Sequence, residues 1–241
     1  MTPAPPLFHW PQGATANVEM FWRWLHIVSA ILWIGLLYFF NLISTPFAAQ
    51  LDPGTRTRIL PMLMWRTLNW FRWGSLVTVF SGLAYLGQIV GAEAKNGHGN
   101  AGLFFGSWFF IWIVVWVLFY LLLRTGSAPG LYAGTTVVII AASWLFLHVN
   151  SHGWESNRSL SIGIGGGMGL LLLLNVWGIV WRANKNILRW MEATSGTGTS
   201  MPPALALLGR QAALASRFSF YLTFVIIFFM GTASHFPLFG V

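Results

Sequence analysis

Cysteine is absent from this 241-residue chain, and acidic residues are scarce, with only five Asp and Glu together. Without cysteine there is no disulfide, no iron–sulfur cluster and no covalently attached c-type haem, so any metal has to be held mainly by histidine. Charged residues make up 7% of the chain, whereas ordinary soluble domains carry about 25%. These shortages exclude an ordinary soluble protein.

Apolar residues are abundant instead, at 56% of the chain, and six apolar runs separate its polar stretches. Each run is long enough to cross about 30 Å of hydrocarbon as a helix that rises ~1.5 Å per residue. We predict an all-α, polytopic membrane protein, in which a Pro-rich arm at residues 1–17 precedes one domain at 18–241. The six transmembrane helices of this bundle are expected at about 20–45, 73–90, 103–123, 131–150, 162–182 and 212–235.

Two connections between these helices are unusually long. In residues 50–72 arginines alternate with Met and Trp, a pattern that indicates a loop plus a surface-lying piece in the interfacial belt of the membrane. Residues 182–211 form the longest polar connection and include a Thr/Ser/Gly-rich tract followed by two prolines. We expect neither segment to belong to a membrane span.

The basic residues define a topology. Ten of the 13 Lys and Arg flank the connections between helices one and two, three and four, and five and six. By the positive-inside rule these connections are cytoplasmic, so both termini are expected on the periplasmic side. The positive charge is therefore explained by membrane orientation, and we expect no nucleic-acid partner. On this topology all six histidines lie toward the outer face: His9, His26, His98, His148, His152 and His235.

His26 stands inside the first apolar run, where Arg23 is the only residue with a fixed charge between positions 20 and 40. An ionisable side chain within a span is costly and by default marks a functional site. His148 and His235 lie within about two turns of the outer ends of two other predicted helices. Two imidazoles from facing helices can hold a b-type haem, whose propionates an outer arginine can meet. We therefore predict haem b, with two of these three histidines as iron ligands and Arg23 at the cofactor.

Other interpretations of the same residues stay open. The histidines can be interfacial residues at helix ends, where an amphipathic ring is comfortable. His148 and His152 would share one face if their helix continued to Gly153, which makes a zinc or copper site a weaker alternative. Serine, histidine and acidic residues do not cluster as a catalytic triad requires, so acid–base chemistry would depend on histidine alone.

Glycine fills five of the seven positions 163–169 at the start of the fifth predicted span. This tract does not fit the pattern GxGxxG, and no strand precedes it, so it is not a nucleotide-binding loop. We expect it to let this helix approach another helix or a flat cofactor closely. Asn175, at mid-depth in the same span, has to find a polar partner inside the bundle.

Several motifs, taken in order along the chain, resemble the membrane domain of the bacterial membrane-bound urate oxidases, and the resemblance covers nearly all six helices. They are LH (25–26), WIGLLYF (33–39), WFRWG (70–74), NVW (175–177) with Trp181, ASR (215–217), FMG (229–231) and SHFP (234–237). In that family a c-type cytochrome domain follows the membrane domain, and electrons from urate pass to cytochrome c. The resemblance implies an electron-transfer role on the outer face. This chain has no cysteine for a CxxCH site, so the cytochrome is expected to be a separate partner.

Together these observations predict a multi-pass electron-transfer protein or subunit of the bacterial inner membrane that passes electrons to a c-type cytochrome. One alternative is a non-catalytic structural subunit of a larger respiratory or photosynthetic complex. The other is an oxidoreductase, a urate oxidase that works with a separate cytochrome c. The expected partners are this cytochrome, other membrane subunits of an electron-transport complex and the lipid bilayer.

Overall fold

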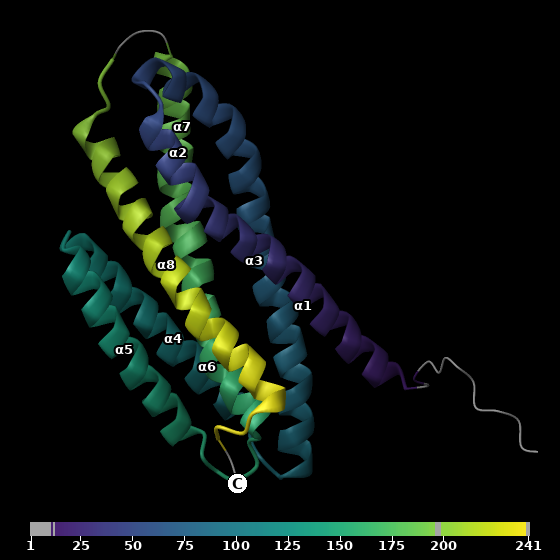
Figure 1. The fold of residues 1–241 in the computed structure, drawn as a ribbon. Helices are drawn as coiled ribbons and strands as arrows, with labels where there is room; N and C mark the ends of the chain where they lie inside the picture. The colour runs from purple at the N-terminus through teal and green to yellow at the C-terminus, as the bar shows by residue number, and fades with distance from the viewer. Residues whose placement is uncertain (1–10, 12, 196–198, 240–241) are drawn as a thin grey trace, which may run out of the picture.

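The computed structural model describes residues 11, 13–195 and 199–239 of the chain. Over these residues the regular structure is helical, with no strand, and six helical stretches are long and apolar enough to cross a membrane. Figure 1 shows them packed side by side into one elongated bundle. The prediction of an all-α, multi-pass membrane protein is confirmed. Most of the expected N-terminal arm, residues 1–10, lies outside the described part of the chain.

The six stretches contain ten helical segments, two of which are π-helical. In order they are α1 (Ala14–Tyr38), the π-helical η1 (Phe39–Ser44), α2 (Thr45–Gln50), α3 (Pro53–Asn96), α4 (Ala101–Arg124), α5 (Ala128–Val149), α6 (Asn157–Asn175), the π-helical η2 (Val176–Val180), α7 (Trp181–Thr194) and α8 (Pro203–His235). The segments α1, η1 and α2 form one continuous helix of 37 residues, and α6, η2 and α7 form another of 38 residues.

The helices are longer than hydropathy indicated. Residues 50–72, expected as a loop and a surface-lying piece, consist mainly of the first turns of α3. Asp52 caps this helix by accepting a hydrogen bond from the Thr55 amide at 3.0 Å, and Pro53 occupies its first turn. The backbone and side-chain hydrogen bonds from Thr55 lower the pKa of the Asp52 carboxyl. Much of the expected connection at 182–211 is likewise helical, in α7 and α8. The expectation was wrong because helical turns rich in polar residues have the low hydropathy of a loop.

These extra turns build a helical extension at one end of the bundle. In Figure 1 the first turns of α3, together with α2, α7 and the start of α8, rise above the shorter α4–α5 hairpin. Trp65 of α3 donates its Nε1 hydrogen to Glu192 of α7 at 2.7 Å. The guanidinium carbon of Arg72 lies 3.9 Å from the ring centroid of Trp181, close enough for a cation–π contact. Arg72 belongs to the motif expected to anchor the chain at the interface, and here it joins two helices.

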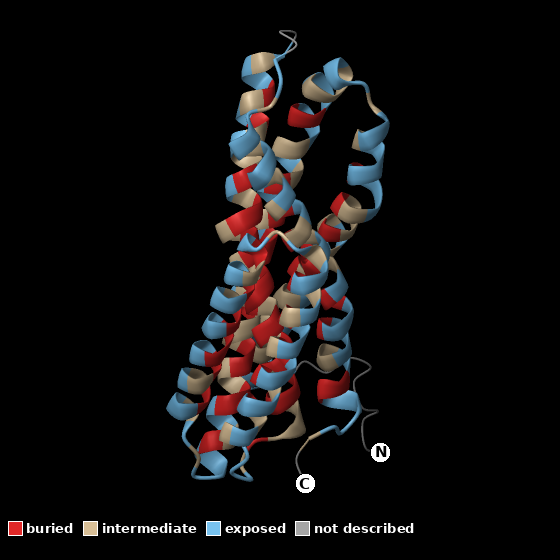
Figure 2. Cartoon of the chain, turned by 90° about the vertical axis from the view of Figure 1, so that its left-hand side faces the viewer, coloured by how far each residue is buried: buried red, intermediate tan, exposed pale blue. Residues whose placement is uncertain are grey.

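The helix α6 lies at the centre of the bundle, and its glycines form the surface on which aromatic side chains pack. Figure 2 shows the buried residues as a red column along the middle of the molecule. A Cβ added to Gly167 would lie 1.9 Å from the Trp112 ring, and one added to Gly163 would lie 2.5 Å from Phe146. Trp108 donates its indole hydrogen to the Gly163 carbonyl at 2.7 Å. The expected close approach of this glycine tract to other helices is confirmed.

We expect Gly167→Ala to lower the free energy of unfolding by about 1–3 kcal/mol, because the new methyl group overlaps the buried Trp112 ring. Gly169→Ala is the matched control, since a Cβ at this position meets no heavy atom within 4 Å. The control should leave stability unchanged or raise it by up to about 1 kcal/mol through helix propensity. SDS-driven unfolding in mixed micelles measures both, and equal midpoints for the two variants would contradict this account of the core.

Candidate functional site

His26 faces α3 from the middle of α1. Its Nδ1 atom lies 2.8 Å from the backbone carbonyl oxygen of Thr78. A carbonyl can only accept a hydrogen bond, so Nδ1 must carry the proton, and the neutral imidazole keeps its lone pair on Nε2. Histidines that bind metals commonly donate their other ring hydrogen to a carbonyl or carboxylate in this way.

A surface of small residues on α3 provides the space for this imidazole. Gly74, Thr78 and Gly82 follow one another at intervals of four residues and so share one helix face. A Cβ on Gly82 would lie 2.8 Å from both Cε1 and Nδ1 of the His26 ring. Gly82 looked like an interruption of the second span in the sequence. The signal for its true role is the regular spacing of the three small residues, which is typical of close helix pairs in membranes.

An ion pair joins the start of α1 to the rest of the bundle. The Arg158 guanidinium on α6 lies 2.7 Å from the Glu19 carboxylate. It also donates a hydrogen bond to the Tyr85 hydroxyl of α3. Arg23, predicted to lie at the cofactor, is exposed one turn before His26 on α1 and makes no polar contact with any other described residue.

The remaining predicted ligands lie on other elements. His148 is exposed on α5, and its ring stacks on Trp144 with centroids 5.3 Å apart and planes 7° from parallel. α5 ends at Val149, so the helical continuation that would align His148 with His152 is missing. His152 instead pairs through Nδ1 with the buried carboxylate of Glu155 at 2.8 Å. The zinc or copper alternative therefore loses its geometric basis.

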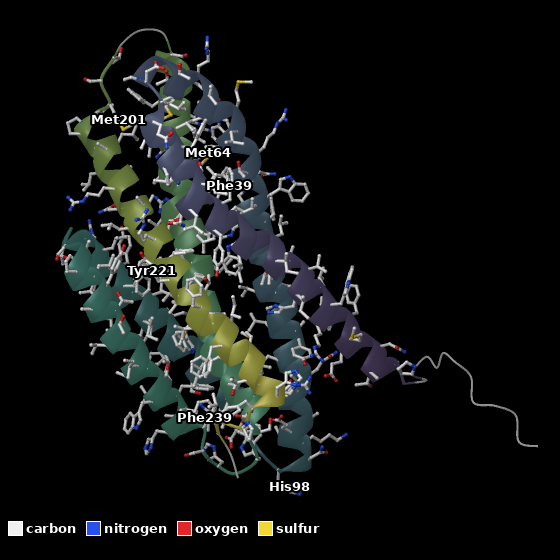
Figure 3. The ribbon with its side chains drawn as sticks, in the orientation of Figure 1. Phe39, Met64, His98, Met201, Tyr221 and Phe239 are labelled. Atoms are coloured by element: carbon white, nitrogen blue, oxygen red, sulfur yellow. The ribbon has the colours of Figure 1, made fainter. Side chains whose placement is uncertain are left out.

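His235 is the last residue of α8 and is exposed. The turn that follows is held by Asn157, whose Oδ1 accepts hydrogen bonds from the Leu238 and Phe239 amides at 2.8 and 2.9 Å. Figure 3 places His98 at the same end of the bundle, beyond α3. In Figure 1 α5 and α1 lie on opposite sides of the bundle, which separates His148 from His26. Within the described residues, no three His, Asp or Glu side chains lie close enough to hold a metal ion.

A second polar region lies deeper in the bundle and was only partly predicted. Three hydroxyl residues of α8 contact polar side chains of the other long helices. The contacts are Asn41 Nδ2 to Ser216 Oγ at 3.0 Å, Asn175 Nδ2 to Ser219 Oγ at 3.3 Å, and Tyr38 Oη to Thr223 Oγ1 at 3.0 Å. The expected internal partner of Asn175 is thus found. The sequence signal for the others is the spacing of these hydroxyl residues by three and four positions, which places them on one helix face.

Both π-helical segments adjoin this region, since η1 contains Asn41 and η2 begins directly after Asn175. Such bulges in α-helices frequently accompany functional sites. A cavity of about 10 Å³ is lined by Trp33, Asn175 and Ser219 among others, and this volume is about that needed by one water molecule. Among the described residues, neither Trp33 Nε1 nor Asn175 Oδ1 has a hydrogen-bond partner.

Comparisons with protein-family models, with curated proteins and with solved structures find no match for this chain. The resemblance to the membrane domain of urate oxidases therefore stays a prediction that rests on the motifs alone.

We expect the Gly82→Ala variant to be destabilised by about 1–3 kcal/mol, because its methyl group would overlap the His26 imidazole. Removing the ring removes the overlap, so adding His26→Ala should recover part of this loss. A double-mutant cycle measured by unfolding in mixed micelles should give a coupling energy of about 0.5–3 kcal/mol.

Gly87→Ala serves as the control on the same helix, because a Cβ there meets no heavy atom within 4 Å. It should show no coupling to His26→Ala. Equal coupling at positions 82 and 87 would refute the proposed packing of the His26 imidazole against Gly82.

Proposed function

We propose that this protein is a membrane-embedded electron carrier in which His26 ligates a b-type haem. The observation that carries this proposal is the hydrogen bond from Nδ1 to the Thr78 carbonyl, 2.8 Å long. It orients the ring and leaves the Nε2 lone pair for a metal. When bound, haem would supply one-electron transfer. Electrons would pass to a separate c-type cytochrome at the periplasmic face.

Two further features support the assignment. Arg23 is exposed one turn before His26 on α1, so its guanidinium is available to a haem propionate. The carbonyl of Thr78 belongs to the backbone of the continuous helix α3, and this helical backbone fixes the acceptor to which the imidazole is hydrogen-bonded. Outer groups of this kind commonly orient a metal ligand and tune its basicity.

A second histidine ligand to the haem iron would have to come from another helix. His148 stacks on Trp144 and His235 ends α8, and neither contacts His26 in the described structure. The hydrogen bond of His26 supports only this ligand, and we retain His148 and His235 as candidate second ligands to be tested by substitution.

A reduced-minus-oxidised spectrum of the purified protein should contain a b-type band. We expect His26→Ala to abolish this band, because the substitution removes the nitrogen that would bind iron. His148→Ala and His235→Ala identify the second ligand, because loss of that residue should change the band or remove it. Absence of a b-type band from the wild-type protein would overturn the haem proposal.

The second candidate function is that of a non-catalytic structural subunit in a respiratory or photosynthetic complex. Figure 1 shows α1 crossing α3, with its N-terminal half diverging from α8. Its exposed face includes Trp24, Ile27 and Ile31, with exposed fractions of 53%, 50% and 69%, and could accept another membrane subunit. Co-purification with a larger complex whose turnover is unaffected by His26→Ala would favour this function. Urate-dependent reduction of added cytochrome c by membranes would instead favour the urate oxidase alternative.

We further propose that the protein resides in the bacterial cytoplasmic membrane with both termini in the periplasm. The natural chain has no cysteine, so one introduced thiol reports its own location. A membrane-impermeant maleimide should label Asn96→Cys from the periplasmic side, because this position precedes the first outer connection, between α3 and α4. It should label Thr125→Cys only after the cytoplasmic membrane is opened. The opposite pattern would reverse the orientation.

A further inference from the structure

A pocket of about 330 Å³ opens between η1, the start of α5 and α8. It is distinct from the surroundings of His26 and does not depend on the haem proposal. Its walls combine two arginines with amide, hydroxyl and apolar side chains. The lining residues are Asn41, Thr45, Tyr132, Arg210, Ala213, Leu214, Ser216 and Arg217.

No carboxylate balances the charge of this pocket. The chain has five acidic residues, and each of them is engaged elsewhere. Their partners are Arg158 for Glu19, Thr55 for Asp52, Ser156 for Glu93, His152 for Glu155 and Trp65 for Glu192. Arg210 donates one hydrogen bond to the Gly126 carbonyl at 2.9 Å. Arg217 is exposed and makes no hydrogen bond to another described residue, so its guanidinium is free to bind an anion.

The depth of the pocket is set by the α4–α5 hairpin. These two helices have 24 and 22 residues, close to the about 20 residues that cross the hydrocarbon of a bilayer. Their connection therefore lies near the membrane surface. Tyr132 is about one turn from the start of α5, and Arg210 bonds to Gly126 within the connection itself. The pocket is thus at the level of lipid headgroups.

We propose that this pocket binds the phosphate group of an anionic phospholipid. Arg210 and Arg217 supply the positive charge, and the guanidinium group matches phosphate oxygens with paired donors. The hydroxyl groups of Tyr132 and Ser216 add neutral donors. Basic pockets between membrane helices at headgroup depth are a recognised basis for binding acidic lipids.

The surface beside the pocket favours a lipid as the source of that phosphate. Tyr221 and Phe224 follow Arg217 by four and seven residues, so all three share one face of α8. The two aromatic side chains are 52% and 55% exposed. Tyr221, labelled in Figure 3, has its ring centroid 6.4 Å from that of Tyr132 in the pocket wall. An acyl chain can therefore run along this face while its headgroup occupies the pocket.

Native mass spectrometry of the full chain tests the proposal with phosphatidylglycerol and phosphatidylcholine of matched acyl chains. We expect preferential retention of phosphatidylglycerol. Replacing Arg217 by Gln should weaken this binding about fivefold, the effect expected from one surface cation on an anionic lipid. Arg217→Gln changes an exposed side chain, and its unfolding midpoint should match that of the wild type.

Arg58→Gln is the control, because Arg58 is an exposed cation of α3 outside the pocket. It should retain phosphatidylglycerol as the wild type does. Inorganic phosphate is added in a separate arm. If millimolar phosphate displaces phosphatidylglycerol, the ligand of the pocket is free phosphate and not a lipid headgroup, which would overturn the lipid proposal. Equal retention of the two lipids, or equal losses in Arg58→Gln and Arg217→Gln, would overturn the proposal.

Discussion

The contact between the glycines of α6 and the tryptophans of α4 is the interaction on which the rest of this bundle depends. Helices in lipid gain no hydrophobic advantage by meeting, because the lipid tails are as apolar as their side chains, so close van der Waals packing has to hold them. Because Gly163 and Gly167 have no side chains, the rings of Phe146 and Trp112 pack directly against the α6 backbone. The Trp108 indole then bonds to a backbone carbonyl at 2.7 Å. Bulkier residues at these glycines would separate the hairpin from the central helix.

The other side of the bundle is assembled by polar contacts. There, the hydroxyl residues of α8 contact Tyr38, Asn41 and Asn175 from the two helices that contain π-helical segments. A buried amide or hydroxyl without a partner is costly in hydrocarbon. These pairings therefore specify how α8 lies against its neighbours, which apolar packing alone would specify less sharply. The same face of α8 continues into the cationic pocket through Ser216, which lines both that pocket and the small cavity beside Asn175.

The sequence was sufficient to predict six spans, because hydropathy over twenty residues is a strong signal. It failed at the ends of α3 and α7, where amphipathic helices outside the hydrocarbon have the composition of loops. His26 was recognisable as an ionisable group inside a span, and Asn175 as an amide in need of a partner. The partner of His26 was not recognisable, because a backbone carbonyl such as that of Thr78 has no sequence signature. The lack of an acidic partner for Arg217 was likewise not recognisable, because it depends on which residues pair with the five carboxylates, and only the folded arrangement determines that.

The helix α3 links the two ends of the molecule. It is one uninterrupted helix of 44 residues, and its only internal proline, Pro61, precedes both Trp65 and the seat of the imidazole at Thr78. These two contact points are separated by about 20 Å along the helix axis, at ~1.5 Å per residue. Between these two points α3 is continuous and contains no proline. His26 of α1 and Glu192 of α7 both bond to this one helix, so the imidazole contact and the helical extension are joined without any intervening loop.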